Sequence, residues 1–137
     1  MDSKTLRLID ANANRAREGL RVIEEVARML WDNGELTKNI KGKRHKITEL
    51  IATLPVSGKD LLIARESSTD VGQPTTIGNE QEREDMEGLL ISNFKRVEEA
   101  LRVLEEFIKL EDTECAEGFK QLRFRVYTIE KEMITEK

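Results

Sequence analysis

The stretch Asn12-Ala-Asn-Arg-Ala-Arg-Glu-Gly-Leu-Arg-Val-Ile-Glu-Glu25 occurs twice in this chain, and the repeat decides the predicted fold. Its second copy is Asn93-Phe-Lys-Arg-Val-Glu-Glu-Ala-Leu-Arg-Val-Leu-Glu-Glu106, which follows the first at a constant distance of 81 residues. Helix packing alone explains a shared pattern of Leu and Val. Shared Asn, Arg and Glu at fixed spacing are harder to explain in that way, so the repeat indicates an internal duplication.

Each copy also has the apolar spacing of a packed helix. Apolar or small residues recur three and four positions apart, which places them on one face of a helix. This seam comprises Leu6, Ile9, Ala13, Ala16, Leu20, Ile23, Ala27 and Leu30 in the first copy, and Leu90, Phe94, Val97, Leu101, Leu104 and Ile108 in the second. Both copies are therefore predicted to be long helices that pack along one side.

A second stripe beside each seam is polar at its N-terminal end. It comprises Asn12, Arg15, Gly19, Val22 and Val26 in the first copy, and Asn93, Arg96, Ala100, Val103 and Phe107 in the second. Glu18 and Glu99 lie three residues beyond the arginines on the same side, so each copy has a polar set of Asn, Arg and Glu. An arginine that continues an apolar stripe is expected to be partly buried, which is unfavourable unless an anion pairs with it. Either internal Arg–Glu pairs fix the register of the helices, or the two polar sets line a pocket for a charged ligand. The duplication favours the pocket, because two related halves bring two such sets together around a pseudo-twofold axis.

The composition indicates a helical protein of one domain, residues 1–137. Charged residues make up 36% of the chain, hydrophobic residues 38% and aromatic residues 4%, a profile typical of all-helical proteins. The net charge of −4 argues against a non-specific nucleic-acid binder, and a single cysteine excludes an intramolecular disulfide. Without an apolar run of about 18 residues or a signal-peptide pattern, we expect a cytoplasmic protein that has no membrane partner.

The helix boundaries follow from the punctuation of the chain. The first helix is predicted from about Ser3 to Trp31, ended by Asn33-Gly34 with the glycine in a left-handed conformation. The second runs from about Glu35 to Leu54 and is stopped by Pro55.

The duplicated unit is longer than one helix. The pattern Lys41-x-x-Arg44-x-Lys46 returns as Lys120-x-x-Arg123-x-Arg125 in the last helix, which Thr113 is expected to cap. The unit is therefore a helical hairpin. We predict an all-α, mostly antiparallel bundle of two duplicated hairpins, residues 3–54 and 80–136, joined by a long central crossover loop at 55–79.

The segment between the hairpins carries polar chemistry. Residues 60–65 are predicted as a short helix or a strand-like piece, and Asn79-x-x-Glu82 resembles a capping box that starts the second long helix. Between them, Arg65 and Asp70 can hold a phosphate or a magnesium ion above a pocket. The alternative is a plain crossover loop with turn residues, which the local chemistry alone favours.

Common catalytic motifs are absent from the sequence. It contains no G-x-x-x-x-G-K-[ST], G-x-G-x-x-G or H-E-x-x-H, and one histidine, His45, leaves no nucleophile–histidine arrangement. If the chain handles phosphates, arginines must bind them, helped by helix N-termini and carboxylate-held magnesium.

Four stretches together resemble one known domain. They are Asp10-Ala-Asn-Ala-Asn-Arg-Ala-Arg-Glu-Gly-Leu-Arg-Val-Ile-Glu-Glu25, the Arg65…Asp70-Val-Gly72 loop, the repeat from Asn93 to Glu106, and Leu122-Arg-Phe-Arg-Val-Tyr127…Glu130-Lys131. The chain resembles the small helical hydroxymethylpyrimidine-phosphate kinase domain that is often fused to the N-terminus of thiamine-phosphate synthase. The family loop usually has the pattern Arg-Asp-Thr…Asp-Val-Gly-Thr, from which this chain departs at Glu66, Ser67 and Gln73.

The resemblance implies a kinase reaction in thiamine biosynthesis. ATP, with magnesium, would phosphorylate 4-amino-5-hydroxymethyl-2-methylpyrimidine phosphate to its diphosphate. The partners would be this phosphorylated pyrimidine, the nucleotide and a thiamine-phosphate synthase, while homo-oligomerisation is left open. Phosphoryl transfer needs mainly positioning and charge neutralisation, which matches a pocket rich in arginine.

We assign hypothetical roles by motif and helix face. Phosphates are assigned to Arg15, Arg17 and Arg96, with Arg65 and Arg123 closing the site. Orienting the ring or the phosphate oxygens is the role assigned to Asn12, Asn14 and Asn93. Binding magnesium, or orienting the arginines, is the role assigned to Glu18, Glu99 and Asp70. Orienting the attacking oxygen is the role assigned to Asp10.

Two other functions remain open from the sequence. The chain is alternatively a non-catalytic helical domain that binds a phosphorylated metabolite or assists a thiamine-phosphate synthase, which the altered loop favours. It is alternatively a purely structural bundle that dimerises through an apolar face, in which the Asn and Arg side chains are all satisfied internally.

Overall fold

The computed structural model describes residues 1–73 and 85–136, and every regular element in them is a helix. The elements are α1 Ser3–Glu25, the π-helix η1 Val26–Leu30, α2 Gly34–Ala52, α3 Gly58–Ala64, α4 Met86–Ile108 and α5 Thr113–Thr135. The prediction of an all-α bundle is confirmed. None of the described helices is long and apolar enough to cross a membrane.

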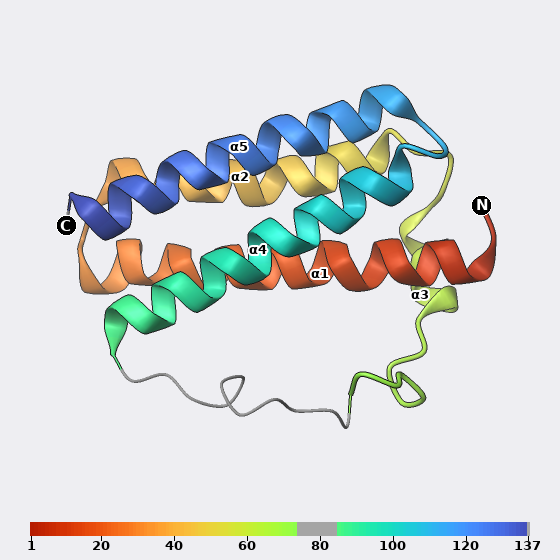
Figure 1. Ribbon diagram of the computed structural model, residues 1–137, viewed down its shortest axis with the longest axis horizontal. Coiled ribbons are helices and arrows are strands. Elements are labelled where there is room, and N and C mark those ends of the chain that lie inside the picture. The colour runs from red at the N-terminus through yellow and green to blue at the C-terminus, as the bar shows by residue number, and fades with distance from the viewer. Residues whose placement is uncertain (74–84, 137) are drawn as a thin grey trace.

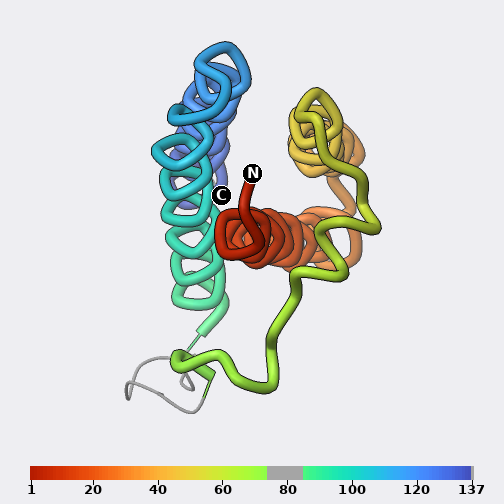
Figure 2. Tube along the Cα trace, turned by 90° about the vertical axis from the view of Figure 1, so that its right-hand side faces the viewer, coloured from red at the N-terminus to blue at the C-terminus, as the bar shows by residue number. Residues whose placement is uncertain are grey.

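The four long helices form two hairpins that pack against each other. In Figure 1, α1 and α4 run in opposite directions and cross obliquely, while α2 and α5 lie together on one side of them. The main contacts join α1 to α4 and α4 to α5, and further contacts join α1 to α2 and α2 to α5. Figure 2 looks along α1 and shows it between the α4–α5 pair and α2. The two copies of the repeat thus lie in α1 and α4, at the centre of the bundle.

The predicted seam forms the core, except at its ends. Its residues from Ile9 to Ala27 and from Leu90 to Ile108 are buried. Leu6 is only partly buried, and Leu30 is 59% exposed. Leu30 belongs to η1, where hydrogen bonds from residue i to i+5 rotate the chain less per residue than an α-helix does. The rotation moves Leu30 off the face on which Ala27 packs.

The two repeat helices approach closely at Gly19. A Cβ atom at Gly19 would lie 2.6 Å from Cγ2 of Val97 and 3.3 Å from the backbone oxygen of Asn93. Glycine therefore allows α1 to pack against the backbone of α4 at the N-terminal end of the second copy. The corresponding position in α4 holds Ala100, which is also buried.

Three predicted helix ends differ in detail from the structure. Asp32, with φ of 48°, takes the left-handed conformation that we expected at Gly34, and Gly34 starts α2 behind the N-cap Asn33. The α5 helix is capped by Asp112, whose side chain accepts a hydrogen bond from the backbone N–H of Cys115, so the expected cap Thr113 is its first residue. An acceptor oxygen one position earlier satisfies the free N–H groups equally well.

The crossover region contains one more helix. The segment expected as a short helix or strand-like piece is α3, which begins at a capping box formed by Ser57 and Asp60. The expected capping box at residues 79–82, and residue 80 as the start of the second hairpin, lie outside the described residues. The described part of α4 begins at Met86, behind the N-cap Asp85.

Candidate functional site

The shared asparagines have a structural role in both halves. Asn12 is buried and its side-chain N–H donates to the backbone oxygen of Leu8 at 2.9 Å. Asn93 makes the same bond to the oxygen of Leu89, also at 2.9 Å. Each asparagine thus bonds to the carbonyl one turn earlier in its own helix. This part of the duplicated pattern is explained by the fold.

The shared arginines and glutamates are instead exposed. Arg15, Glu18, Arg96 and Glu99 all have exposed side chains, which contradicts the expectation that the arginines are partly buried. Their long side chains reach water from the edge of the stripe. Arg15 donates from Nη1 to Oδ1 of Asn12 at 3.0 Å, and no ion pair joins Arg15 to Glu18 or Arg96 to Glu99 in residues 1–73 and 85–136. The predicted Arg–Glu pairs within each copy are therefore not formed there.

A second group of predicted residues does come together, around Asp10. Arg65 donates from Nε to Oδ2 of Asp10 at 2.8 Å and from Nη2 to Oδ1 at 2.9 Å. Asn14 donates to Oδ1 of Asp10 at 3.2 Å, and Arg17 donates to Asn14 at 2.8 Å and to the hydroxyl of Thr48 at 3.3 Å. We call Asp10, Asn14, Arg17 and Arg65 the Asp10 cluster. It links α1 to α2 and to the segment after α3.

The electrostatics of the Asp10 cluster follow from its contacts. The hydrogen bonds and charge of Asp10 raise the pKa of Arg65, and the nearby charge of Glu18 adds to this effect. Burial lowers the pKa of Arg17, against the attraction of Asp10 and Glu18. Glu18 thus lies close enough to act on both arginines. The cluster combines two cations with one buried carboxylate, so cationic hydrogen-bond donors remain for an anion.

The helix pattern connects the Asp10 cluster to Arg15. Ala11, Asn14, Arg15 and Glu18 are three or four residues apart, so they share one face of α1. Ala11 is exposed and small, and it lies one turn before Asn14 and Arg15. We call these four residues the outer face of α1. Arg15 belongs to this face, and Arg17 and Arg65 flank it on the side of α2 and α3.

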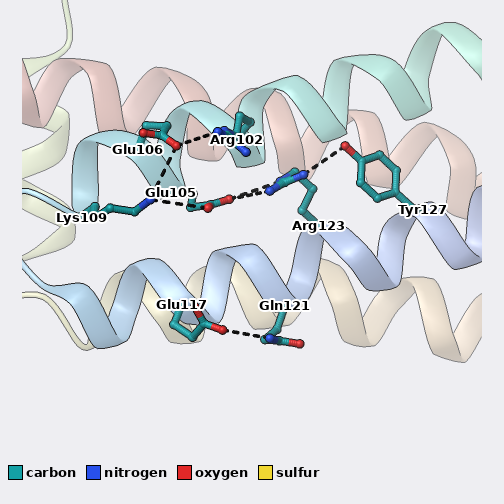
Figure 3. A network of polar contacts seen from close by, with 8 residues as sticks. All are labelled: Arg102, Glu105, Glu106, Lys109, Glu117, Gln121, Arg123 and Tyr127. Atoms are coloured by element: carbon teal, nitrogen blue, oxygen red, sulfur yellow. Dashed lines mark hydrogen bonds and ion pairs between the residues drawn. The ribbon is translucent and has the colours of Figure 1, made fainter.

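Arg123 lies elsewhere, in an internal ion pair. Its Nη2 and Nε donate to Oε1 of Glu105 at 2.9 and 3.3 Å, and its Nη1 donates to the hydroxyl of Tyr127 at 3.2 Å (Figure 3). The first half contains the same pair, in which Arg44 donates to Glu24 at 2.9 and 3.4 Å. All four residues belong to the repeat. Their parallel spacing was the signal that would have paired them from the sequence alone.

Asp70 holds its own turn, because its Oδ1 accepts from the backbone N–H of Gly72 at 2.8 Å. The three residues expected to hold magnesium, Glu18, Glu99 and Asp70, do not form a cluster. In the part of the chain that the structure describes, no three acidic, histidine or cysteine side chains are placed to hold a metal ion. A magnesium site here would therefore depend on oxygens from a substrate.

Sequence reasoning missed a further polar cluster, made by Lys95, Glu98 and Glu130, of which Glu98 is buried. Lys95 donates to Oε1 of Glu98 at 3.3 Å and to Oε2 of Glu130 at 3.2 Å. Burial, followed by a hydrogen bond with Glu130 and its charge, raises the pKa of Glu98 to about 8. The other oxygen of Glu98 is buried without a partner among the described residues. The carboxyl group of Glu98 therefore keeps its proton to a higher pH than an ordinary glutamate does.

The structure has hollows away from the outer face of α1. One of about 520 Å³ lies between η1 and the start of α2, lined by Arg28, Asp32, Lys38 and Lys41 among others. A second, of about 470 Å³, lies between α2 and α5. Neither is lined by Arg15, Arg96 or the Asp10 cluster.

Comparisons with known proteins cover nearly the whole chain. The ThiD2 family matches residues 7–132. The thiamine-phosphate synthase of Synechocystis sp. is 45% identical over 131 residues, which are 96% of this chain and 36% of that protein. The thiamine-phosphate synthase of Nostoc punctiforme is 41% identical over 93% of this chain, and that of Rhodopirellula baltica is 36% identical over 96% of it. The matched part is 35% of each of these two proteins. This chain thus spans about a third of the length of these curated relatives. No solved structure matches it.

Proposed function

Because this chain belongs to the ThiD2 family, we propose that it is a kinase of thiamine biosynthesis. In this proposal it uses ATP and magnesium to convert 4-amino-5-hydroxymethyl-2-methylpyrimidine phosphate to the diphosphate. The observation that carries the proposal is the outer face of α1, which contains Arg15 and is flanked by Arg17 and Arg65. Two phosphorylated substrates bring several negative charges to one place, and arginine binds phosphate through paired N–H donors.

The chemistry of the acceptor suits a site without a general base. An oxygen of the acceptor phosphate attacks the γ-phosphorus of ATP, the bond to the β–γ bridging oxygen breaks, and ADP leaves. A phosphate monoester is largely ionised at pH 7, because its second pKa is about 6. The nucleophile therefore needs no proton removed, and the protein mainly positions the two phosphates and neutralises their charge.

Within this proposal Asp10 is a positioning residue. Two of the five guanidinium N–H donors of Arg65 point to Asp10, so three remain for a phosphate. Because Asp10 is buried and also bonded to Asn14, it holds the Arg65 guanidinium in one orientation. Our expectation that Asp10 orients the attacking oxygen is replaced by this role.

Magnesium fits the site as a substrate-held ion. Kinases usually bind it through one or two carboxylates together with substrate phosphates, where it neutralises the charge that develops during transfer. Glu18 is the carboxylate on the outer face of α1, and its charge already acts on Arg17 and Arg65. We therefore assign the protein ligand of magnesium to Glu18, with Glu99 on α4 as the alternative carboxylate.

The test is an ADP-release assay with ATP, magnesium and the pyrimidine phosphate. We expect Arg15→Ala, Arg65→Ala and Arg96→Ala each to lower kcat/KM at least about tenfold, which corresponds to one lost charged hydrogen bond. Arg102→Ala is the matched control, because among the described residues this exposed arginine forms its ion pair with Glu106 on its own helix. If the folded variants keep the wild-type kcat/KM, the outer face of α1 is not the active site.

A non-catalytic function has one observation in its favour. Arg15 and Arg96 are exposed, and neither of the two hollows described above is lined by them. In this second proposal the chain binds the phosphorylated pyrimidine, or assists a thiamine-phosphate synthase, without turnover. Calorimetric binding of the pyrimidine phosphate combined with no ADP release would support it over the kinase.

A further inference from the structure

The hollow between α2 and α5 has an unusual concentration of positive charge. Its lining contains Lys43, Lys46 and Arg125, together with Gln121 and Leu122, and includes no acidic residue. The whole chain has a net charge of −4, so three cations on one small concave surface do not reflect the general composition. We call Lys43, Lys46, Gln121 and Arg125 the basic groove.

Ion pairs satisfy little of this charge. Lys46 has one loose contact, 3.7 Å from Oε2 of Glu49 at an exposed position, and such surface pairs contribute little. No ion pair to Lys43 or Arg125 is found within residues 1–73 and 85–136. Burial and the positive charge of Arg125 lower the pKa of Lys43, so the two cations face each other across the groove. Like charges held together without a counter-charge favour the binding of an anion.

The internal duplication explains why these cations meet. Lys46 and Arg125 occupy corresponding positions of the two hairpins, as do Gly42 and Gln121, and Lys43 and Leu122. The groove is thus lined by matching turns of α2 and α5, which run side by side on the same side of α1 (Figures 1 and 2). The duplication thus accounts for the pair Lys46 and Arg125, while Lys43 is a cation of the first half alone.

Small residues give the groove its depth. A Cβ atom at Gly118 would lie 2.5 Å from Cδ2 of Leu50, so glycine lets α5 approach α2 closely below the groove. Gly42 has open space around it. The buried Leu122 adds an apolar residue to a lining whose cations come from both helices. The side-chain amide of Gln121 donates one N–H to Glu117 at 2.9 Å, which leaves its second N–H for a ligand.

We propose that the basic groove binds a small molecule carrying a chain of two or more phosphates. Three cations from two facing helices match several neighbouring anionic groups better than a single phosphate. The groove is distinct from the outer face of α1 and from the Asp10 cluster, because it shares no residue with either. The proposal is therefore independent of the kinase activity.

The first experiment is calorimetry with sodium tripolyphosphate, ATP and inorganic phosphate. If the groove recognises a phosphate chain, tripolyphosphate and ATP should bind with similar Kd, and inorganic phosphate should bind at least about tenfold more weakly. Added salt should weaken the binding of all three. To separate the groove from the proposed active site, the titrations use the Arg15→Ala/Arg96→Ala variant, which keeps the groove intact. Lys43→Gln, Lys46→Gln and Arg125→Gln are each expected to raise Kd at least about fivefold, through loss of one charged contact.

A triple control keeps the change in net charge equal. The groove triple variant combines Lys43→Gln, Lys46→Gln and Arg125→Gln. Its control replaces three exposed residues outside the groove with Gln, namely Lys4, Arg102 and Lys131, and so changes the net charge by the same amount. The amide NMR signals of Gly42 and Gly118 provide the second measurement, and tripolyphosphate should shift them more than that of Gly58. Equal Kd values for the two triple variants, or unmoved signals of Gly42 and Gly118, would overturn the proposal.

Discussion

The two halves of this molecule share one set of polar contacts and differ in another. Both contain the asparagine that bonds back to the previous turn, and both contain a buried Glu–Arg pair between the helices of the hairpin. They differ where α1 has Asp10, Asn14 and Arg17, because the corresponding residues of α4 are Ile91, Lys95 and Glu98.

The difference separates structural contacts from candidate functional ones. A contact that is present in both halves and buried in both is explained by the hairpin fold. A cluster present in one half only, such as the Asp10 cluster, is not required by that fold. The exposed Arg15 and Arg96 form a third class, because they are shared although no common contact within residues 1–73 and 85–136 accounts for them.

The largest expected effect is at the shared ion pair. Arg123→Met leaves Glu105 buried without its main partner, which is expected to lower the free energy of unfolding by about 3–5 kcal/mol. Arg44→Met should lower it less, since the side chain of Arg44 is 19% exposed against 9% for Arg123, and Arg123 also stacks on Phe124 and Tyr127. Urea unfolding followed by circular dichroism measures both values.

A second pair of variants distinguishes pairing from packing. Arg123→Met combined with Glu105→Leu removes both charges, so most of the lost stability should return. If the double variant is as unstable as Arg123→Met alone, the pair does not act through its buried charge. The same double replacement at Glu24 and Arg44 tests whether the two halves behave alike.

The next effect concerns Glu98, which belongs to the cluster found only in the second half. Its pKa of about 8 in the fold lies above the ordinary value of 4.5, so the folded state holds a proton that the unfolded state releases. Stability should therefore fall as the pH rises from about 4.5 to 8, and Glu98→Gln should remove this loss. We expect the variant to be more stable by about 1–2 kcal/mol at pH 8, allowing for screening by solvent.

The measurement is the difference in Tm between wild type and variant at pH 5 and at pH 8. Glu132→Gln is the control, because it removes an exposed glutamate from the same bundle without touching Lys95 or Glu130. Parallel Tm profiles for wild type and Glu98→Gln would show that Glu98 does not carry a proton in the folded state.

Much of the fold was predictable because apolar periodicity survives in every long helix. The seam from Ile9 to Ala27 and its counterpart in α4 are buried as predicted, since spacing alone fixes which side of a helix is apolar. The end of α1 was not predictable. The η1 turn depends on hydrogen bonds between residues five apart, which composition does not signal.

The candidate site was predictable by residue type more than by partner. Asp10, Asn14 and Arg17 were identified by their positions in the recognised motif, but the bond of Asp10 to Arg65 joins residues 55 positions apart. Arg123 was assigned to the phosphate site although it pairs with Glu105. A helical pattern gives the direction of a side chain on its own helix, while its partner depends on how the helices rotate against each other.

The smallest effect tests the approach of the two repeat helices. Gly19→Ala places a methyl group 2.6 Å from the buried Val97, and the overpacking is partly offset by the better helix propensity of alanine. We expect a net loss of about 1 kcal/mol. In the repeat, Gly19 corresponds to Ala100 and Val97 corresponds to Ala16. The symmetry-related pair of positions therefore holds two alanines, where the first pair holds a glycine and a valine.

The duplication therefore supplies its own rescue experiment. Gly19→Ala combined with Val97→Ala recreates the alanine pair, and its loss of stability should be smaller than the sum of the two single losses by about 1 kcal/mol. Gly34→Ala is the control for helix propensity, because a Cβ atom there meets nothing within 4 Å. Strictly additive losses would mean that Gly19 and Val97 do not set the distance between α1 and α4, and the twofold relation of the halves would then rest on the shared ion pairs alone.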